Sequence, residues 1–162
     1  MPVILLYDAL RESHERQRTL CRRLLRTKSG SNVRRDVFGE LRVELAAHAA
    51  AEERYLYVAM LLDDAGLSSS RHALAEHHEI EELVQELQVA KKLGRGWMAT
   101  AKKLSKKVHH HLREEETKFF QLSGKILATA QKKKLGVQYV ADYERMKAKL
   151  TTETVRAASP GS

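Results

Sequence analysis

Residues 48–53 read His-Ala-Ala-Ala-Glu-Glu, and the same pattern returns 63 residues later, where residues 111–116 read His-Leu-Arg-Glu-Glu-Glu. Another histidine precedes each stretch by 34 residues, His14 before the first and His77 before the second. Residues four apart lie on one face of a helix, about 6 Å from each other. Each His-Glu pair can therefore direct two ligand atoms at one point, and the repeat predicts helices that carry a metal site.

The residues around these motifs repeat with the same offset, so two halves of the chain are related. The matched pairs are Leu20 with Leu83, Leu24 with Leu87, Leu41 with Leu104, Glu53 with Glu116, and Leu56-Tyr57 with Phe119-Phe120.

Apolar residues recur at helical spacing in four long segments, over residues 3–27, 33–62, 70–93 and 97–130. Polar or glycine-containing stretches at residues 28–32, 63–66 and 94–96 separate them, and Ser68, Ser69 and Ser70 are candidate N-caps of the third helix. Short links between long helices favour antiparallel neighbours. We therefore expect an all-α, up-down-up-down four-helix bundle.

A shorter amphipathic segment over residues 137–150 is expected to pack on the outside of the bundle as an additional C-terminal helix. Residues 1–150 thus form the expected domain. From Thr151 the chain is small and polar, and residues 151–162 are expected to be a flexible tail.

The composition of the 162 residues fits one helical domain, because two prolines and eight glycines leave long uninterrupted stretches. The single cysteine, Cys21, excludes an internal disulfide framework, fits a reducing compartment and is interpreted as a core residue. No apolar run approaches the roughly 20 residues that span a bilayer, and residues 2–7 are too short for a signal-peptide core. A cytoplasmic protein without a membrane partner is expected.

The formal net charge of +8 suggests a second possibility, a basic helical module that binds nucleic acid or another partner. The densest lysine run, residues 102–107, leaves Leu104 and Val108 on one face and the lysines elsewhere. This pattern favours a solvated helix surface. Aromatic stacking platforms and helix-turn-helix spacing are missing from the sequence, so nucleic-acid binding is the weaker interpretation.

Six ionisable residues fall on otherwise apolar helix stripes, where polar groups are costly unless they are paired or bound to metal. These candidate metal ligands are His14, His48, Glu52, His77, His111 and Glu115. Four imidazoles and two carboxylates suit two divalent metals, and such donors accept iron, manganese or zinc.

The other histidines are weaker candidates. His110 and Glu114 form a second pair at the same four-residue spacing, but the 63-residue repeat selects His111. His78 is rotated about 100° from His77 on the same helix. His72 is expected to be exposed near the start of the third helix. Glu81 follows His77 by four residues, and both a surface charge and an additional ligand remain open for it.

With these residues placed, the chain resembles the hemerythrin-like family, also called the HHE cation-binding domain, over about residues 3–130. The matching elements are Ser-His-Glu-Arg-Gln at 13–17, the two stretches quoted first, and Glu-His-His-Glu-Ile at 76–80. The resemblance implies a di-iron centre with an oxo or hydroxo bridge, in which Glu52 and Glu115 bridge the metals and the four histidines are terminal ligands. It also implies binding of dioxygen, nitric oxide or peroxide.

One departure from the family's oxygen carriers bears on function. These carriers have a fifth histidine four residues from another on the third helix, where this chain has Ala73 and Glu81 on either side of His77. An open coordination position permits chemistry as well as binding. Sensing, storage or scavenging of a small oxidant is therefore the leading interpretation, and a peroxide-removing or iron-oxidising enzyme is the alternative.

Tyr55 and Tyr57 lie close to Glu52 in the sequence and are interpreted either as bundle packing or as a hydrogen-bonding or redox-active phenol near the metals.

Overall fold

The computed structural model describes residues 5–89 and 95–158, and every regular element in these ranges is helical. The elements are α1 (Leu6–Leu24), α2 (Asn32–Glu52), η1 (Glu53–Tyr57), α3 (Val58–Leu61), α4 (Asp64–Val89), α5 (Arg95–Glu114), η2 (Glu115–Phe119), α6 (Phe120–Ile126) and α7 (Thr129–Ala158). The two η segments are π-helical turns inside longer helices. The all-α fold class is thereby confirmed.

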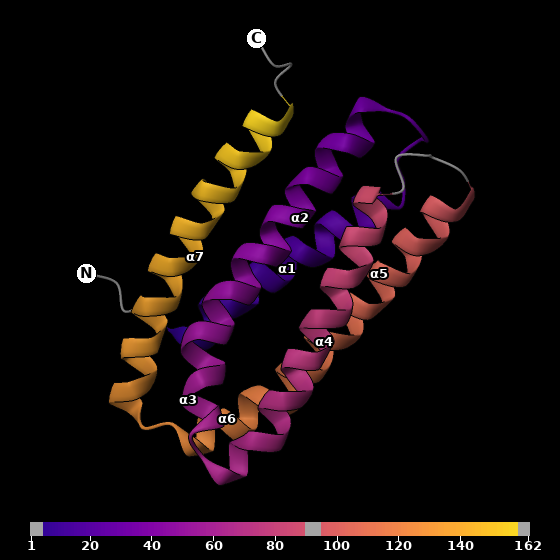
Figure 1. Cartoon of the computed structure of the whole chain (residues 1–162). Coiled ribbons are helices and arrows are strands. Elements are labelled where there is room, and N and C mark those ends of the chain that lie inside the picture. Colours follow the sequence, from indigo (N-terminus) through magenta and orange to yellow (C-terminus); the bar gives the residue numbers. More distant parts are fainter. Residues whose placement is uncertain (1–4, 90–94, 159–162) are drawn as a thin grey trace.

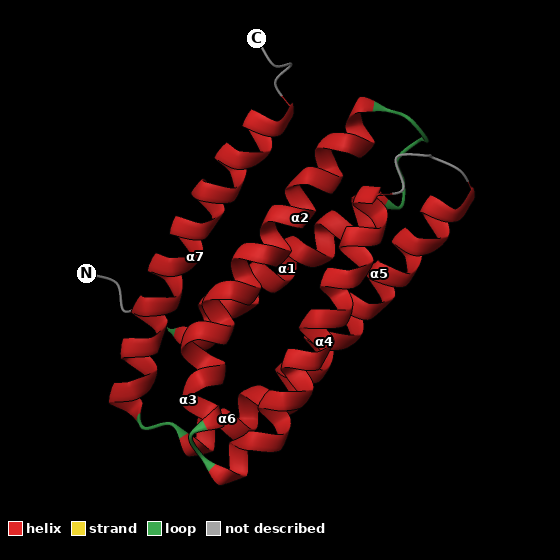
Figure 2. Cartoon of the chain, viewed as in Figure 1, coloured by secondary structure: helices red, strands yellow, loops and turns green. Residues whose placement is uncertain are grey.

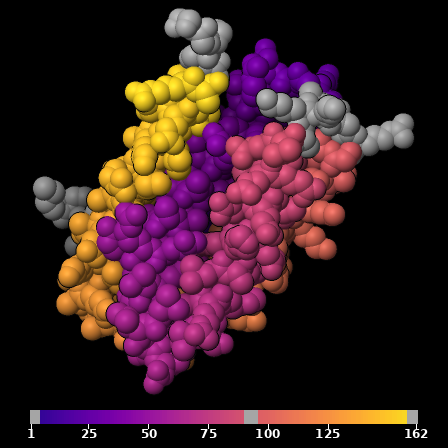
Figure 3. Space-filling view, viewed as in Figure 1, coloured from indigo at the N-terminus to yellow at the C-terminus, as the bar shows by residue number. Residues whose placement is uncertain are grey.

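Four helical rods form the bundle: α1, the continuous run α2–η1–α3, α4, and the continuous run α5–η2–α6 (Figures 1 and 2). Helix α7 lies along α2 and also contacts α1. Figure 3 shows its side chains, in orange and yellow, against those of α2, in violet. The predicted four-helix bundle with an additional C-terminal helix is present.

Two apolar clusters fill the bundle and leave a polar layer between them. One cluster occupies the end near Leu10, Leu56 and Phe120, and the other occupies the end near Leu24, Leu41 and Leu104. On each helix the predicted ligand lies between residues of these two clusters. The apolar layers therefore exclude water from both sides of the polar layer. Cys21 is buried in the second cluster, as expected, and burial raises the pKa of its thiol to about 12.

The corner between α1 and α2 agrees with the sequence. Gly30 has a φ of 71°, the left-handed region that glycine adopts without strain. The Ser31 hydroxyl then accepts a hydrogen bond from the Arg34 N–H and caps α2.

The prediction for the next corner was wrong in detail. Helix α4 begins at Asp64 rather than Ser70, because the Asp63 side chain accepts the Ala65 N–H and turns the chain directly into the helix. Ser70 is no cap, since its hydroxyl donates to the Gly66 carbonyl within α4. The third predicted break, residues 94–96, lies partly outside the described residues, and Arg95 and Gly96 belong to α5.

The C-terminal boundaries also differ from the prediction. The fourth rod ends at Ile126, and the chain turns at Leu127, whose extended backbone places its side chain in the apolar core. Helix α7 then runs for 30 residues, so it is much longer than the predicted segment 137–150. Residues 151–158 of the predicted flexible tail are helical, and residues 159–162 lie outside the described part.

Among the described helices, none is long and apolar enough to cross a membrane.

Candidate metal centre

The structure brings all six predicted ligands into the polar layer of the bundle. Their donor atoms form two groups, His14 with His48 and His77 with His111, and both groups include Glu52 and Glu115. Within each group the donor atoms lie within 4.8 Å of one another, and all six residues are buried. The arrangement therefore forms two adjacent donor groups that share two carboxylates.

The Nε2 atoms of the four histidines face the two carboxylates. His14 Nε2 lies 3.2 Å from Glu115 Oε1, and His77 Nε2 lies 3.3 Å from Glu52 Oε1. Within single helices, His48 Nε2 lies 3.4 Å from Glu52 Oε1 and His111 Nε2 lies 3.6 Å from Glu115 Oε2. Ligand atoms of a tetrahedral metal with bonds of about 2.0–2.1 Å are roughly 3.3 Å apart, so these separations fit shared ions.

Buried atoms without hydrogen-bond partners provide a test of whether a metal fits. Among the described residues, five such atoms face the centre: His14 Nε2, His48 Nε2, both oxygens of Glu52, and Glu115 Oε1. Buried polar groups are nearly always satisfied by a partner, and unsatisfied ones are costly. Two cations would supply the missing partners, so the residues fit the metal pair that the sequence predicts.

The opposite ring nitrogen, Nδ1, has a separate partner in each of the four histidines. Glu116 Oε2 lies 2.8 Å from Nδ1 of His14, and Glu53 Oε1 lies 2.8 Å from Nδ1 of His77. A carboxylate accepts the Nδ1 proton and leaves Nε2 free for a metal.

The remaining two histidines have different partners. Glu76 Oε1 lies 3.1 Å from Nδ1 of His111, whereas the Tyr139 hydroxyl of α7 lies 2.8 Å from Nδ1 of His48. All four rings are thus fixed in orientation before any metal binds.

The π-helical turns explain how neighbouring glutamates serve two histidines. Glu52 ends α2 and Glu53 begins η1, and the wider turn directs Glu52 at the centre and Glu53 at His77. At η2, Glu115 likewise faces the centre, and Glu116 faces Nδ1 of His14. Such turns are frequent at functional sites.

Tyr57 is a buried phenol at the edge of the centre. Its hydroxyl donates a short hydrogen bond to Glu115 Oε2 and lies 3.3 Å from His77 Nε2. Burial and the carboxylates of Glu115 and Glu52 raise the pKa of Tyr57 well above its ordinary value. A nearby cation would have the opposite effect on this pKa. Tyr55, in contrast, only packs half-buried against the apolar core.

Charge in the metal-free centre is balanced by protons. Burial lowers the pKa of His14, but Glu115 and Glu116 outweigh this effect and raise it to about 9. For His77, burial also lowers the pKa, and Glu52 and Glu53 raise it to about 10. Burial raises the pKa of Glu52, whereas His48 and His77 hold it well below its ordinary value. Protonated His14 and His77 therefore offset the carboxylate charge when metal is absent.

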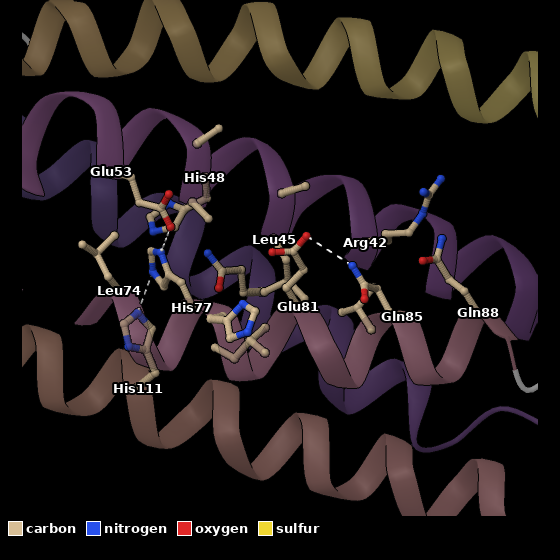
Figure 4. Close-up of a pocket in the computed structure, with 17 residues that line it drawn as sticks. Arg42, Leu45, His48, Glu53, Leu74, His77, Glu81, Gln85, Gln88 and His111 are labelled. Atoms are coloured by element: carbon tan, nitrogen blue, oxygen red, sulfur yellow. Dashed lines mark hydrogen bonds and ion pairs between the residues drawn. The ribbon is translucent and has the colours of Figure 1, made fainter. Parts of the chain in front are cut away.

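A cavity of about 510 Å³ opens beside the centre between α2 and α4. Figure 4 shows His48, His77 and His111 at one end of it, with Glu81, Gln85 and Gln88 along its length. Glu81 is exposed and accepts a hydrogen bond from Gln85, so it lies outside the two donor groups. The cavity therefore reaches one side of the centre.

The other histidines lie outside the buried centre. His78 is 70% exposed and pairs with Glu82, and His72 is exposed, as expected. His110 pairs with Glu114 at the surface, so the register that selects His111 agrees with the structure.

Sequence reasoning missed Tyr139 and the role of the three glutamates that hold Nδ1 atoms. The repeat of Glu53 in Glu116 was a signal for two of them. Glu76 precedes His77 directly and carried no distinctive spacing. Tyr139 lies outside the repeat, so nothing in the sequence pattern connects it with His48.

A family model for the Hemerythrin HHE cation binding domain matches residues 5–123, which include all six candidate ligands. The chain belongs to this family. The resemblance predicted from the motifs is confirmed, and the buried His and Glu groups are those of an HHE cation-binding domain able to hold metal ions. Helix α7, with Tyr139, lies beyond the matched range.

A solved structure shares the HHE fold. It is the crystal structure of a hemerythrin HHE cation binding domain-containing protein from Mycobacterium kansasii, with a TM-score of 0.84 and 22% sequence identity. The match covers 97% of this chain and 95% of that one, so it includes most of α7. No curated protein sequence matches the chain.

Proposed function

We propose that this protein holds two iron ions in the centre formed by the four histidines and two glutamates, and that it binds dioxygen or a related small oxidant such as nitric oxide or peroxide. The biological role would be sensing, storage or scavenging. Iron is proposed on family membership, because imidazole and carboxylate donors also accept manganese or zinc.

The observation that carries this proposal is the sharing of Glu52 and Glu115 between two donor groups. Shared carboxylates hold two cations close together, and five unpaired buried donor atoms point at the same space. A reduced iron pair supplies the electrons with which a small oxidant is bound or reduced.

The protein's own groups would control access and protonation. The cavity between α2 and α4 reaches His48, His77 and His111 of the centre. The Tyr57 hydroxyl, next to Glu115 and His77, is a neutral proton donor at the centre. It can donate a hydrogen bond to an anionic ligand held there.

The test combines metal analysis with an optical spectrum of protein that is reduced without oxygen and then exposed to it. We expect about two central irons per chain and a change in charge-transfer absorption on oxygenation. His78→Ala is the matched control, because His78 is an exposed histidine on α4 outside the centre. The proposal would be contradicted if the absorption spectrum of iron-loaded protein did not change on addition of dioxygen, nitric oxide or peroxide.

A second candidate function is a peroxide-removing or iron-oxidising enzyme that uses the same metals. The buried Tyr57 phenol beside the centre favours it, because turnover of peroxide or oxygen needs protons and electrons delivered at the metals. Turnover assays on iron-loaded wild type and Tyr57→Phe distinguish the two functions. Sustained peroxide loss or ferrous oxidation that weakens in the variant would support the enzyme, and stoichiometric binding would support the first proposal.

A further inference from the structure

Two further His-x-x-x-Glu pairs face each other on the surface between α4 and α5. One is His72 with Glu76 on α4, and the other is His110 with Glu114 on α5. Each pair has the four-residue spacing of the central motifs. Because the two helices pack side by side, the pairs meet across the helix interface.

The Nε2 atoms of both histidines lie near both carboxylates, and the donor atoms of His72, Glu76 and Glu114 all lie within 4.8 Å of one another, a group that does not include His110. His72 Nε2 lies 3.1 Å from Glu114 Oε2 and 3.4 Å from Glu76 Oε1. His110 Nε2 lies 3.3 Å from Glu114 Oε2 and 3.7 Å from Glu76 Oε2. These four separations bracket the roughly 3.3 Å expected between ligands of a tetrahedral cation with bonds of about 2.0–2.1 Å.

The carboxylates are more constrained than ordinary surface acids. The Glu76 side chain is 5% exposed and that of Glu114 is 25% exposed, whereas the side chains of His72 and His110 are 58% and 59% exposed. The Glu76 side chain is also held on its buried side, because its Oε1 accepts a hydrogen bond from Nδ1 of His111. The two glutamate side chains therefore lie on the inner side of the cluster, and the two histidine side chains lie on its solvent side.

Two lysines lie near this cluster and compete with a cation for it. Lys107 Nζ is 3.9 Å from Glu76 but is held more closely by Glu79. Lys118 Nζ is 3.8 Å from Glu114 Oε1 and its side chain is 78% exposed. Both ammonium groups sit on long flexible side chains, and neither is at hydrogen-bond distance from the cluster, so a metal can displace them.

A cavity of about 330 Å³ joins the cluster to the central site. His72, Glu76 and Glu114 line it, and so do His111 and Glu115 of the centre. Glu76 belongs to both environments at once, because one of its oxygens holds His111.

We propose that His72, Glu76 and Glu114 form a third, mononuclear site for a divalent first-row transition cation such as zinc or ferrous iron, and that the exposed His110 side chain rotates to complete it. Two imidazoles and two carboxylates are a mixed donor set that suits these ions better than magnesium or calcium. The site is separate from the two central positions but shares Glu76 with the outer support of His111. It does not depend on which metal occupies the centre.

The test uses full-length protein whose central metals have been loaded and counted. Cobalt(II) is then added as the probe, and bound cobalt is measured by equilibrium dialysis with metal analysis and by visible absorption. Wild type should bind one cobalt beyond the central metals. His72→Ala and His110→Ala should each weaken this binding about tenfold or more.

His78→Ala is the control, because His78 also pairs with a glutamate four residues on, Glu82, but has no second pair opposite it in the described chain. Its cobalt binding should equal that of wild type. Since His72 and His110 are exposed, all three variants should keep their central metal count and circular dichroism spectrum.

Glu76→Gln tests the shared carboxylate, and it should weaken the cobalt site and also reduce retention of metal at His111. Absence of an additional cobalt in wild type would overturn the proposal, and so would an additional cobalt that survives in the His72→Ala, His110→Ala double variant. The central metal count is measured in the same samples, so failure of the third site is distinguishable from failure of the di-iron proposal.

Discussion

The central histidines divide their two ring nitrogens between two tasks. In each of them Nε2 faces the shared carboxylates and Nδ1 faces an outer partner. An imidazole held at Nδ1 loses little orientational freedom when Nε2 binds a metal, so the site is organised in advance. We therefore expect the loss of an outer partner to weaken metal binding.

The first prediction tests the register of the histidine run. His111→Ala should leave fewer than two central metals per chain, whereas His110→Ala should keep both, because about 100° of helix rotation separates the two side chains. Metal analysis after dialysis measures the difference. Loss of central metal in His110→Ala with retention in His111→Ala would refute the buried site described above.

The second prediction concerns Tyr139, the outer partner that α7 supplies. Tyr139→Phe removes the hydroxyl at Nδ1 of His48 while keeping the ring, and it should weaken central metal binding by about 10- to 100-fold. Competition with a chelator gives the affinity. Tyr143→Phe is the matched control, because this stacked neighbour on α7 bonds Glu44 rather than a central histidine. Equal affinities in the two variants would exclude a positioning role for Tyr139.

The third prediction is the pH dependence of the metal-free protein. The pKa of His14 is about 9 and that of His77 is about 10, both above the ordinary 6.5. Their protonated forms stabilise the folded state fully below pH 6.5, and this stabilisation declines as the pH rises until it is lost above pH 9 to 10. Melting temperatures of chelated protein should therefore fall between pH 6.5 and pH 10. A flat or rising profile there would show that these imidazoles are neutral in the folded protein.

The six central residues were predictable because a duplicated spacing can be read directly from the sequence. Their outer partners were only partly predictable. Glu53 and Glu116 carry the repeat, but Tyr139 approaches His48 from a helix about 90 residues away that has no counterpart in the first half. This contact depends on how α7 packs against α2, and the spacing of residues along the sequence does not predict that packing.

At the scale of elements, the two π-helical turns direct the paired glutamates, and the corner between α3 and α4 is closely packed. The corner is narrow: a Cβ on Gly66 would lie 2.5 Å from the Met60 carbonyl oxygen and 2.9 Å from its Cε. The oxygen belongs to the backbone and cannot move aside easily. This contact, rather than an unusual backbone angle, requires glycine at the first turn of α4.

The fourth prediction follows from that contact. Gly66→Ala should lower the free energy of unfolding by about 1–3 kcal/mol, the usual cost of overpacking. Gly39→Ala is the control, because no described atom lies within 4 Å of the position that a Cβ would take there. This substitution should raise the free energy of unfolding by about 0.5–1 kcal/mol. Urea unfolding of both variants measures the opposite signs. A Gly66→Ala variant as stable as wild type would mean that the corner relaxes.

The number and order of the helices followed from apolar periodicity, but several ends did not. Asp63 and Gly66 carry the residue types of a loop, and in the fold they form the immediate start of α4. The length of α7 was underestimated because residues 151–157 are mostly exposed, and an exposed helix end lacks the apolar stripe that periodicity detects. The π-helical turns have no distinctive composition.

At the scale of the whole molecule, the bundle places four imidazoles and two carboxylates between two apolar layers. Without metal, protons on His14 and His77 reduce the electrostatic cost of burying the carboxylates. Folding and metal binding are therefore linked.

The fifth prediction is that removing the central metals lowers the melting temperature at pH 7.5. At free metal 100 times the dissociation constant, binding adds about 2.7 kcal/mol, or roughly 5–10 °C for a chain of this size. Differential scanning calorimetry with and without a chelator measures it. Identical melting temperatures would indicate a satisfied polar core that needs no metal.

The two halves of the repeat match at the ligands but differ just behind them. Around His77 and His111 the outer partners are two carboxylates, Glu53 and Glu76. Around His14 and His48 they are Glu116, whose charge Arg18 neutralises at 2.5 Å, and a phenol.

The two donor groups consequently differ in the charge that surrounds them. If each group binds an ion as proposed, the two carboxylates behind His77 and His111 would favour the more highly charged ion there. A duplicated sequence would thus yield two binding positions with different preferences for charge.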